Sequence, residues 1–241
     1  MSRRPHPPTI VFDLDGTLVD TVADIAAALD RALAPYGCRS TRAEEAAAMM
    51  GEGLSGFFWR ALVAKRLSLP AEEAAETYQR FIAAYRQSPV RRSRIYPGMA
   101  ALLEDLRGGG AHTAVCTNKV EDIALGILEQ LDLLDLFDAV VGHRGDRPKK
   151  PDPLTLLEAI SLAGGSRDRA LMVGDTGADS SAAIAAGIPA ILVSYGYSPV
   201  HVRALSTDVH VDSVDELRNE VLQFMATSEP HRIRAKRYAR K

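Results

Sequence analysis

Residues 9–20 read TIVFDLDGTLVD and place two carboxylates, Asp13 and Asp15, directly after a short apolar run. Aspartate is a poor strand former, and side chains two residues apart on an extended backbone project to the same side. The two negative charges repel each other unless positive groups lie close by. The stretch therefore predicts a buried strand that leads into an acidic site with a cationic partner.

The composition is typical of a soluble, globular chain. Of its 241 residues, 46% are hydrophobic and 25% are charged, and the formal net charge is -2. This balance gives no general attraction to nucleic acid or to an anionic membrane. No apolar run reaches the length of a membrane-spanning helix, and the start, MSRRPHPPTI, lacks the apolar centre of a signal peptide. We therefore expect a cytoplasmic protein without nucleic-acid or membrane partners, whose cysteines, Cys38 and Cys116, are reduced.

Two patterns divide the chain. From about residue 21 to about residue 86, apolar residues recur at helical spacing between Gly and Pro breaks, which predicts roughly four helices. After residue 91, short apolar runs alternate with helical segments, a rhythm typical of a doubly wound parallel sheet with crossover helices. The first strand belongs to this sheet, so the block of helices interrupts it.

We accordingly expect an α/β fold in which a helical subdomain is inserted into a parallel-sheet domain. The expected divisions are a tail at 1–8, the sheet domain at 9–20 and 91–226, the helical subdomain at 21–90 and a basic tail at 227–241. The simplest interpretation of the basic tail is a solvated terminus. The sequence leaves the choice between a monomer and a homodimer open.

Polar side chains follow four of the predicted strands. Ligands bind beyond the carboxyl ends of the strands in an open parallel sheet, so these side chains should converge. Carboxylates form a hard-oxygen site that suits Mg²⁺, while a hydroxyl, an amide and a lysine suit phosphate. Together, the metal ion and the lysine supply the positive charge that compensates the carboxylates of Asp13 and Asp15. The residues are Asp13 and Asp15, Thr117 and Asn118, Lys149 and Lys150, and Asp175 and Asp179.

These residues lie in four motifs, which read DLDGTLVD at 13–20, CTNK at 116–119, KKPDP at 149–153 and VGDTGAD at 173–179. On these motifs the chain resembles the haloacid dehalogenase superfamily of phosphotransferases. The resemblance implies a Rossmann-like α/β core, Mg²⁺ as the cofactor and hydrolysis of a phosphate ester through an aspartyl-phosphate. The inserted helices look like the type-1 cap of this superfamily.

The resemblance also implies a role for each acidic residue. Asp13 would be the nucleophile, and Asp15 would protonate the leaving group and later deprotonate the attacking water. The metal would bind to Asp13, Asp175 and the backbone carbonyl of Asp15, and Asp179 would support that site. A turn-capping pair is the alternative for Asp13 and Asp15, and a helix cap is the alternative for Asp179.

The remaining motif residues would bind the phosphoryl group. Thr117 would donate a hydrogen bond to a phosphoryl oxygen, assisted by the backbone around Leu14 and Gly16, and Asn118 is a further candidate ligand. Taken alone, Thr117 would be an ordinary helix N-cap.

A lysine would neutralise both the phosphoryl group and the nucleophile. Lys150 is preferred because it directly precedes proline, as in the pattern of the superfamily, and Lys119 is the alternative. Taken alone, Lys150 would be a surface lysine in a loop.

The substrate is indicated by a resemblance within the superfamily. The stretch MMGEGLSGFFWRAL at 49–62 is similar to a cap segment of phosphoglycolate phosphatases, as are TNK and KKPDPLTLLEA. This implies 2-phosphoglycolate as the small-molecule substrate, with the cap closing over the cleft. A solvated linker is the simpler interpretation of the arginines among the candidate cap contacts, which are Glu52, Arg60, Arg91, Arg92 and Arg94.

Other functions stay open at this point. Pyrophosphate, nucleotide or sugar-phosphate hydrolysis differs only in the details of the cap, and a phosphomutase shares all four motifs. A non-catalytic binding protein with the same fold would be expected to lose the nucleophile or the metal carboxylates, which are intact. A dehalogenase has no use for an acid at Asp15 or a metal carboxylate at Asp175.

Overall fold

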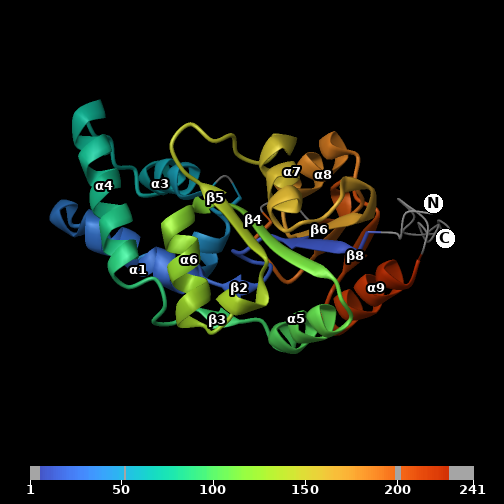
Figure 1. Ribbon diagram of the computed structural model, residues 1–241. Coiled ribbons are helices and arrows are strands. Elements are labelled where there is room, and N and C mark those ends of the chain that lie inside the picture. Colours follow the sequence, from blue (N-terminus) through green and yellow to red (C-terminus); the bar gives the residue numbers. More distant parts are fainter. Residues whose placement is uncertain (1–5, 52, 199–201, 228–241) are drawn as a thin grey trace, which may run out of the picture.

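The computed structural model describes residues 6–51, 53–198 and 202–227. Within them, six parallel strands form one sheet in the order β5-β4-β1-β6-β7-β8 (Figure 1). The strand first in sequence therefore lies inside the sheet, between strands that follow it by more than a hundred residues. The strands are β1 (Thr9–Phe12), β4 (His112–Val120), β5 (Ala139–His143), β6 (Ala170–Gly174), β7 (Ala190–Val193) and β8 (Val209–Val211).

Helices cover both faces of the sheet, as the alternating pattern predicts (Figure 1). Ile10 and Phe12 of β1 face one helical layer, whereas Val11 faces the other, because successive side chains of a strand alternate. One layer is formed by α5 (Met99–Gly108), α6 (Glu121–Gln130) and α9 (Val214–Ala226), and the other by α7 (Pro153–Leu162) and α8 (Gly177–Ala186). Short 3-10 turns lie at Leu134–Leu136, Arg167–Arg169 and Val202–Ala204. The predicted doubly wound α/β fold is confirmed.

A block of helices is inserted after the first strand. It contains α1 (Val22–Leu33), a 3-10 turn (Ala34–Tyr36), α2 (Ala43–Ala47), α3 (Gly53–Ala64) and α4 (Ala71–Gln87). The helices α1 and α4 pack against each other, and Phe57, Phe58 and Phe81 form an aromatic core between α3 and α4. This matches the expectation of helices alone in this region. The division of the chain into domains stays a prediction.

A short ribbon joins the inserted helices to the sheet. Its strands are β2 (Val19–Asp20) and β3 (Arg94–Ile95), which pair antiparallel where the chain enters and leaves the helical block. This ribbon was not predicted from the sequence, because two residues are too few to show a strand period.

The end of β4 corrects a detail of the sequence analysis. Thr117 and Asn118 were expected after the strand, but both lie inside β4. The register between β4 and β5 shifts between Cys116 and Val120, so the regular ladder is interrupted there. An irregularity of this kind frees polar side chains at a strand end without ending the extended backbone.

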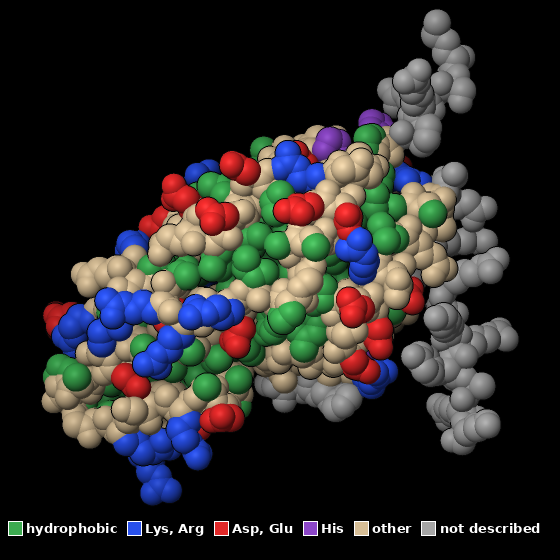
Figure 2. Space-filling model, turned by 90° about the horizontal axis from the view of Figure 1, so that it is seen from below, with side chains coloured by type: hydrophobic (Ala, Val, Ile, Leu, Met, Phe, Trp, Pro, Cys, Tyr) green, Lys and Arg blue, Asp and Glu red, His purple; other side chains and the backbone are tan. Residues whose placement is uncertain are grey.

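The outer surface mixes both signs of charge. On the face that Figure 2 shows, Lys and Arg side chains gather at the end formed by the inserted helices, while acidic and basic side chains intermingle elsewhere. Within the described residues, no helix has both the length and the apolar character needed to span a membrane.

Candidate active site

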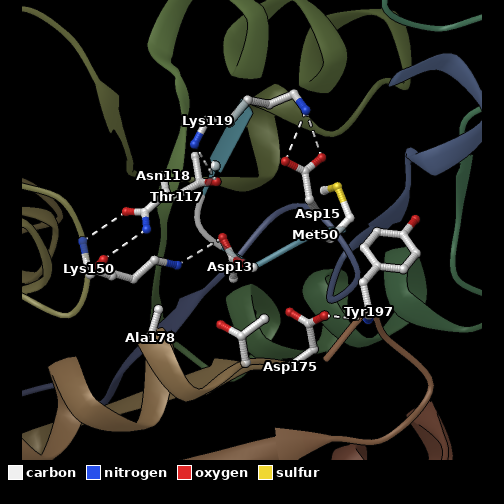
Figure 3. Close-up of a pocket in the computed structure, with 13 residues that line it drawn as sticks. Asp13, Asp15, Met50, Thr117, Asn118, Lys119, Lys150, Asp175, Ala178 and Tyr197 are labelled. Atoms are coloured by element: carbon white, nitrogen blue, oxygen red, sulfur yellow. Dashed lines mark hydrogen bonds and ion pairs between the residues drawn. The ribbon is translucent and has the colours of Figure 1, made fainter. Parts of the chain in front are cut away.

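A cleft opens at the carboxyl edge of the sheet, where the inserted helices approach it (Figure 3). Six of the eight residues that were expected to act in catalysis or to bind the phosphoryl group or the metal line it. The other two, Gly16 and Asp179, lie against the lining residues Asp175 and Lys150. Lys149 is not among the lining residues. The lining residues are Asp13, Asp15, Met50, Gly51, Gly53, Thr117, Asn118, Lys119, Lys150, Asp175, Thr176, Ala178 and Tyr197.

A tight turn after β1 separates the two neighbouring carboxylates. Asp13 continues the line of β1, since its N–H donates to the carbonyl of Val173 at 2.9 Å. Gly16 then adopts a φ of +82°, and a Cβ atom there would lie 2.3 Å from Asp175 Oδ2. The N–H of Gly16 donates to the carbonyl of Val19 at 3.0 Å, so it is used inside the turn. Glycine is therefore required here both by its φ and by the close approach of Asp175.

Lys150 lies against the first carboxylate. Its Nζ is 2.9 Å from Asp13 Oδ1 and 2.6 Å from Asp179 Oδ1, and it also donates to the carbonyl of Cys116 at 2.6 Å. The side chain is 2% exposed. Burial opposes its charged form, but the attraction of Asp13 and Asp179 outweighs burial and raises the pKa of Lys150.

Lys119 lies against the second carboxylate. Its Nζ is 2.7 Å from Asp15 Oδ1 and 3.0 Å from Asp15 Oδ2, and its charge sits 4.6 Å from the centre of the Tyr85 ring on α4. The hydroxyl of Thr21 also donates to Asp15 Oδ1. Burial lowers the pKa of Lys119, although Asp15 acts in the opposite direction. Asp13 and Asp15 thus each have a lysine of their own, whereas the sequence suggested Lys119 only as an alternative to Lys150.

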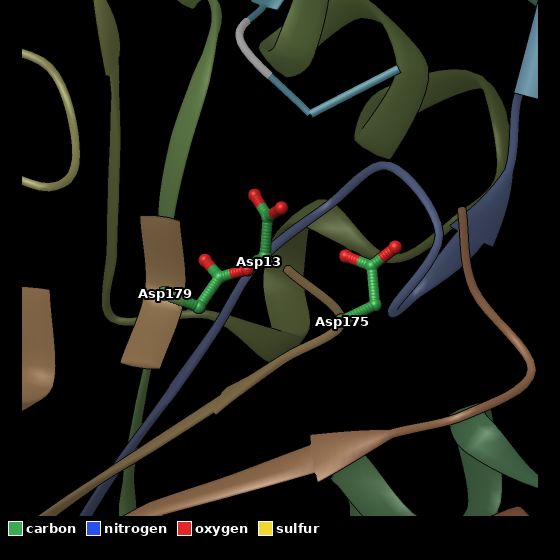
Figure 4. Close-up of side chains that lie close together, drawn as sticks. All are labelled: Asp13, Asp175 and Asp179. Carbon is green, nitrogen blue, oxygen red and sulfur yellow. The ribbon is translucent and has the colours of Figure 1, made fainter. Parts of the chain in front are cut away.

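Asp13 belongs to a cluster of three carboxylates, with Asp175 and Asp179 (Figure 4). Asp13, Asp175 and Asp179 are buried, and each offers an oxygen within 4.8 Å of the other two. Burial raises the pKa of Asp13 to about 6, against the opposing effect of Lys150. Burial, together with the charges of Asp179 and Asp13, raises the pKa of Asp175 well above its usual range.

This cluster fits a divalent metal ion. Three carboxylates face one ammonium group, Lys150, which leaves an excess of two negative charges when all of them are ionised. Buried charges need compensation, and carboxylate oxygens are the ligands that Mg²⁺ prefers. The side chain of Asp15 lies outside this cluster, with Lys119, so only its backbone carbonyl is left as the predicted metal contact.

Asp179 combines the two interpretations that the sequence left open. It is the third residue of α8, and its carboxylate accepts from the N–H of Thr176 at 3.0 Å and from the Thr176 hydroxyl at 2.7 Å. The same carboxylate accepts from Lys150. A Cβ atom at Gly174 would lie 2.3 Å from Asp179 Cγ, so the glycine at the end of β6 makes room for it. Asp179 therefore caps the helix and also belongs to the acidic cluster.

Asn118 and Thr117 each bind the backbone of one of the two lysines. The Asn118 amide donates to the carbonyl of Lys150 at 2.9 Å and accepts from its N–H at 2.8 Å. Thr117 Oγ1 accepts from the N–H of Lys119 at 3.2 Å. Asn118 thus positions the backbone of Lys150, and its role as a substrate ligand stays a prediction.

The predicted cap arginines, Arg60, Arg91, Arg92 and Arg94, are not among the residues that line the cleft. Arg60 donates to the carbonyls of Met49 at 2.8 Å and Met50 at 3.4 Å, and so supports the loop that reaches the cleft. The backbone N–H groups of Arg91 and Arg92 donate to Asp24. The guanidinium of Arg94 donates to the backbone carbonyls of Arg91 and Ser93. Glu52 lies outside the described residues.

The segment at 49–62 was expected to belong to the cap, but its lining residues and Tyr197 were not named from the sequence. The inserted block reaches the cleft with Met50, Gly51 and Gly53, and a Cβ atom at Gly53 would lie 3.0 Å from the carbonyl of Asn118. Tyr197 lies beyond β7, and its N–H donates to Asp175 Oδ2 at 2.7 Å (Figure 3). Ligands bind beyond the carboxyl ends of parallel strands, and the same reasoning applied to the end of β7 would have included Tyr197.

The chain is similar to known proteins along most of its length. The family model of haloacid dehalogenase-like hydrolases matches residues 10–193. Proteins named phosphoglycolate phosphatase are similar over most of the chain. One from Agrobacterium fabrum is 38% identical over 212 residues, or 88% of this chain and 91% of that protein. One from Caulobacter vibrioides is 37% identical over 205 residues, which are 85% of this chain and 86% of that protein. A crystal structure described as a predicted phosphoglycolate phosphatase from Haemophilus somnus has a TM-score of 0.81 at 26% identity, and covers 90% of this chain and 97% of that one.

Proposed function

Because the chain belongs to the haloacid dehalogenase-like hydrolases, we propose that it is a phosphoric monoester hydrolase that acts on 2-phosphoglycolate. The observation that carries this proposal is the buried contact of Asp13 with Lys150 beside Asp175 and Asp179. A carboxylate held between an ammonium group and further carboxylates suits nucleophilic attack on a phosphate bound through a metal ion. The names of the relatives supply the substrate.

Asp13 is the proposed nucleophile. Its carboxylate oxygen attacks phosphorus, while Lys150 and the Thr117 hydroxyl stabilise the negative charge of the phosphoryl group. Lys150 is suited to this role because its ammonium is already within 2.9 Å of Asp13. As the new bond between oxygen and phosphorus forms, the bond to the leaving oxygen breaks.

Asp15 is the proposed acid and base. Its carboxyl group gives a proton to the leaving alkoxide oxygen, and the carboxylate that remains takes a proton from the water that hydrolyses the aspartyl-phosphate. Lys119 and Thr21 hold this side chain from two sides, so its direction is set before the substrate binds.

Asp13, Asp175 and the backbone carbonyl of Asp15 are the proposed ligands of Mg²⁺, with Asp179 in support. When bound, the ion neutralises these carboxylates and polarises the phosphoryl oxygens. We expect millimolar Mg²⁺ to raise the melting temperature of the wild type. An ion at about a hundred times its dissociation constant stabilises by roughly 2.7 kcal/mol, which is on the order of 5–10 °C for a chain of this size.

Differential scanning fluorimetry with Mg²⁺ and then EDTA measures this effect. Asp175→Asn should lose most of the shift, whereas Asp132→Asn, an exposed residue with a φ of +55° that asparagine tolerates, should keep it. An equal shift in Asp175→Asn would remove this residue from the metal site.

The inserted helices are the proposed cap, covering residues 21–90, over a core formed by 9–20 and 91–226. Three contacts between the two parts support a cap that lies over the core. The ribbon β2–β3 joins the two parts, Gly53 approaches Asn118, and Arg86 on α4 forms an ion pair with Asp122 on α6 at 2.8 Å. In this arrangement the loop at Met50 excludes water from the reacting group. A cytoplasmic location is part of the same proposal.

Phosphate release from a panel of esters, with and without Mg²⁺, tests the function. The panel contains 2-phosphoglycolate, sugar phosphates, nucleoside monophosphates and pyrophosphate. We expect kcat/KM for 2-phosphoglycolate to exceed the others by at least about a hundredfold, or roughly 2.7 kcal/mol in transition-state binding. A flat profile would remove the substrate assignment, and release from none of the esters would remove the hydrolase assignment.

A further inference from the structure

The hydroxyl of Tyr197 caps the first helix of the inserted block. It accepts from the N–H of Thr21 at 2.7 Å and from the N–H of Val22 at 3.2 Å, and it donates to Asp20 Oδ1. Thr21 is the N-cap residue of α1 but makes no side-chain cap of its own. N–H groups in the first turn of a helix have no partner inside the helix and need one from elsewhere. Tyr197, from the far end of the chain, provides it.

The other end of Tyr197 is held in the acidic cluster. Its backbone N–H donates to Asp175 Oδ2 at 2.7 Å, and its side chain is buried. The preceding residue, Gly196, packs so closely that a Cβ atom there would lie 2.3 Å from Asp175 Oδ2 and 2.5 Å from the carbonyl of Gly16. Tyr197 is therefore a rigid link between the floor of the cleft and the point where the chain enters the helical block.

The start of α1 is in turn connected to the second carboxylate. The side chain of Thr21, whose N–H is held by Tyr197, donates to Asp15 Oδ1. Lys119 holds Asp15 from the other side. The backbone position of Thr21 therefore sets one of the two contacts that orient the Asp15 carboxyl group.

We propose that Tyr197 is a positioning residue: its hydroxyl anchors the start of α1, and through Thr21 it aligns Asp15 with the leaving group. The consequence for catalysis rests on the proposed function, in which Asp15 is the proton donor. The anchoring of α1 does not rest on it and is measured separately.

The dependence on the leaving group distinguishes this role from a general structural one. When Asp13 attacks phosphorus, the electron pair of the broken bond goes to the leaving oxygen. An alkoxide such as that of glycolate needs a proton from Asp15, whereas p-nitrophenolate is stable without one. The value of kcat/KM reports only the steps up to release of this first product. A misaligned Asp15 should therefore lower kcat/KM for 2-phosphoglycolate much more than for p-nitrophenyl phosphate.

The variant Tyr197→Phe keeps the ring and the backbone contact with Asp175 and removes only the hydroxyl. We expect kcat/KM for 2-phosphoglycolate to fall by at least about tenfold, and the value for p-nitrophenyl phosphate to stay within about twofold. Tyr195→Phe is the matched control, because within the described residues its hydroxyl forms a single long hydrogen bond, at 3.4 Å to the carbonyl of Thr17. It should leave both values within about twofold of wild type.

Thr21→Ala separates the contact between Tyr197 and α1 from the contact between Thr21 and Asp15. It removes the contact with Asp15 but keeps the N–H that Tyr197 binds, so it should show the same dependence on the leaving group. The double variant should lose little more than either single variant, because both changes act on one connection. An equal loss with both substrates in Tyr197→Phe, or additive losses in the double variant, would overturn the proposed alignment of Asp15.

Hydrogen exchange measures the anchor without any substrate. The amides of Thr21 and Val22 should exchange at least about tenfold faster in Tyr197→Phe than in wild type, and at unchanged rates in Thr21→Ala and Tyr195→Phe. Unchanged exchange in Tyr197→Phe would overturn the anchor. A wild type that hydrolyses no ester would instead refute the proposed function, and the exchange rates would still decide whether Tyr197 holds α1.

Discussion

Asp13→Asn is expected to lower the rate of phosphate release by at least about a thousandfold. A carboxamide is a poor nucleophile, and loss of an enzyme's nucleophile commonly removes most of its rate enhancement. The neighbouring carboxylates cannot substitute for it. Asp15 is paired with Lys119, and Asp179 is turned toward Lys150 and the start of α8. Steady-state phosphate release from 2-phosphoglycolate at saturating Mg²⁺ measures the effect.

Two controls show that a loss of activity in Asp13→Asn comes from the missing nucleophile. The change removes one of three crowded, buried carboxylates, so the melting temperature without metal should not fall below that of wild type. Asp132→Asn makes the same chemical change at an exposed position and should keep full activity. Turnover above a tenth of wild type in Asp13→Asn would rule out Asp13 as the nucleophile.

Lys150→Met is expected to destabilise the metal-free protein by about 3–5 kcal/mol, because it leaves buried carboxylates without their positive partner. Lys150 is 2% exposed and contacts both Asp13 and Asp179. Without its charge, the pKa of Asp13, which burial already raises to about 6, should rise further and favour the protonated, non-nucleophilic form. Activity should therefore fall by at least about a hundredfold. Urea unfolding and phosphate release measure the two effects.

Lys149→Met is the matched control for this variant. Lys149 lies next to Lys150 in the same loop but is only partly buried, so its replacement should change stability by less than about 0.5 kcal/mol. Mg²⁺ should restore part of the lost stability in Lys150→Met, since the ion can balance the same carboxylates. A stability equal to wild type in metal-free Lys150→Met would show that the cluster does not depend on this lysine.

Much of the fold and part of the candidate site follow from local sequence patterns. A strand buried on both faces needs apolar residues at successive positions, as in TIVF at 9–12. The helices that cover it need apolar residues at helical spacing, so the alternation of apolar runs and helical segments after residue 91 indicates a sheet between two helical layers. Parallel strands end at one edge of the sheet. The sequence alone therefore assigns Asp13, Thr117, Lys150 and Asp175 to one edge of the sheet, where the structure places them.

The pairing of charges within that place could not be predicted from the sequence. Lys150 meets Asp13 and Lys119 meets Asp15 because of the turn at Gly16 and the register shift near the end of β4. Each of these two ion pairs joins residues that are more than a hundred positions apart in the sequence. The motif pattern correctly favoured Lys150, but it contains no signal that Lys119 is the partner of the second carboxylate.

By itself, the sequence determined the class of fold, the membership of the family and the chemical groups that gather at one edge of the sheet, because short apolar periods and strand ends are local properties. Only the tertiary structure decided which lysine serves which aspartate, that Asp179 is both a helix cap and a cluster member, and that Tyr197 joins the cleft floor to the start of α1. These relations arise from packing between distant segments, where hydrogen-bond and charge partners are selected by distance in space and leave no period in the sequence.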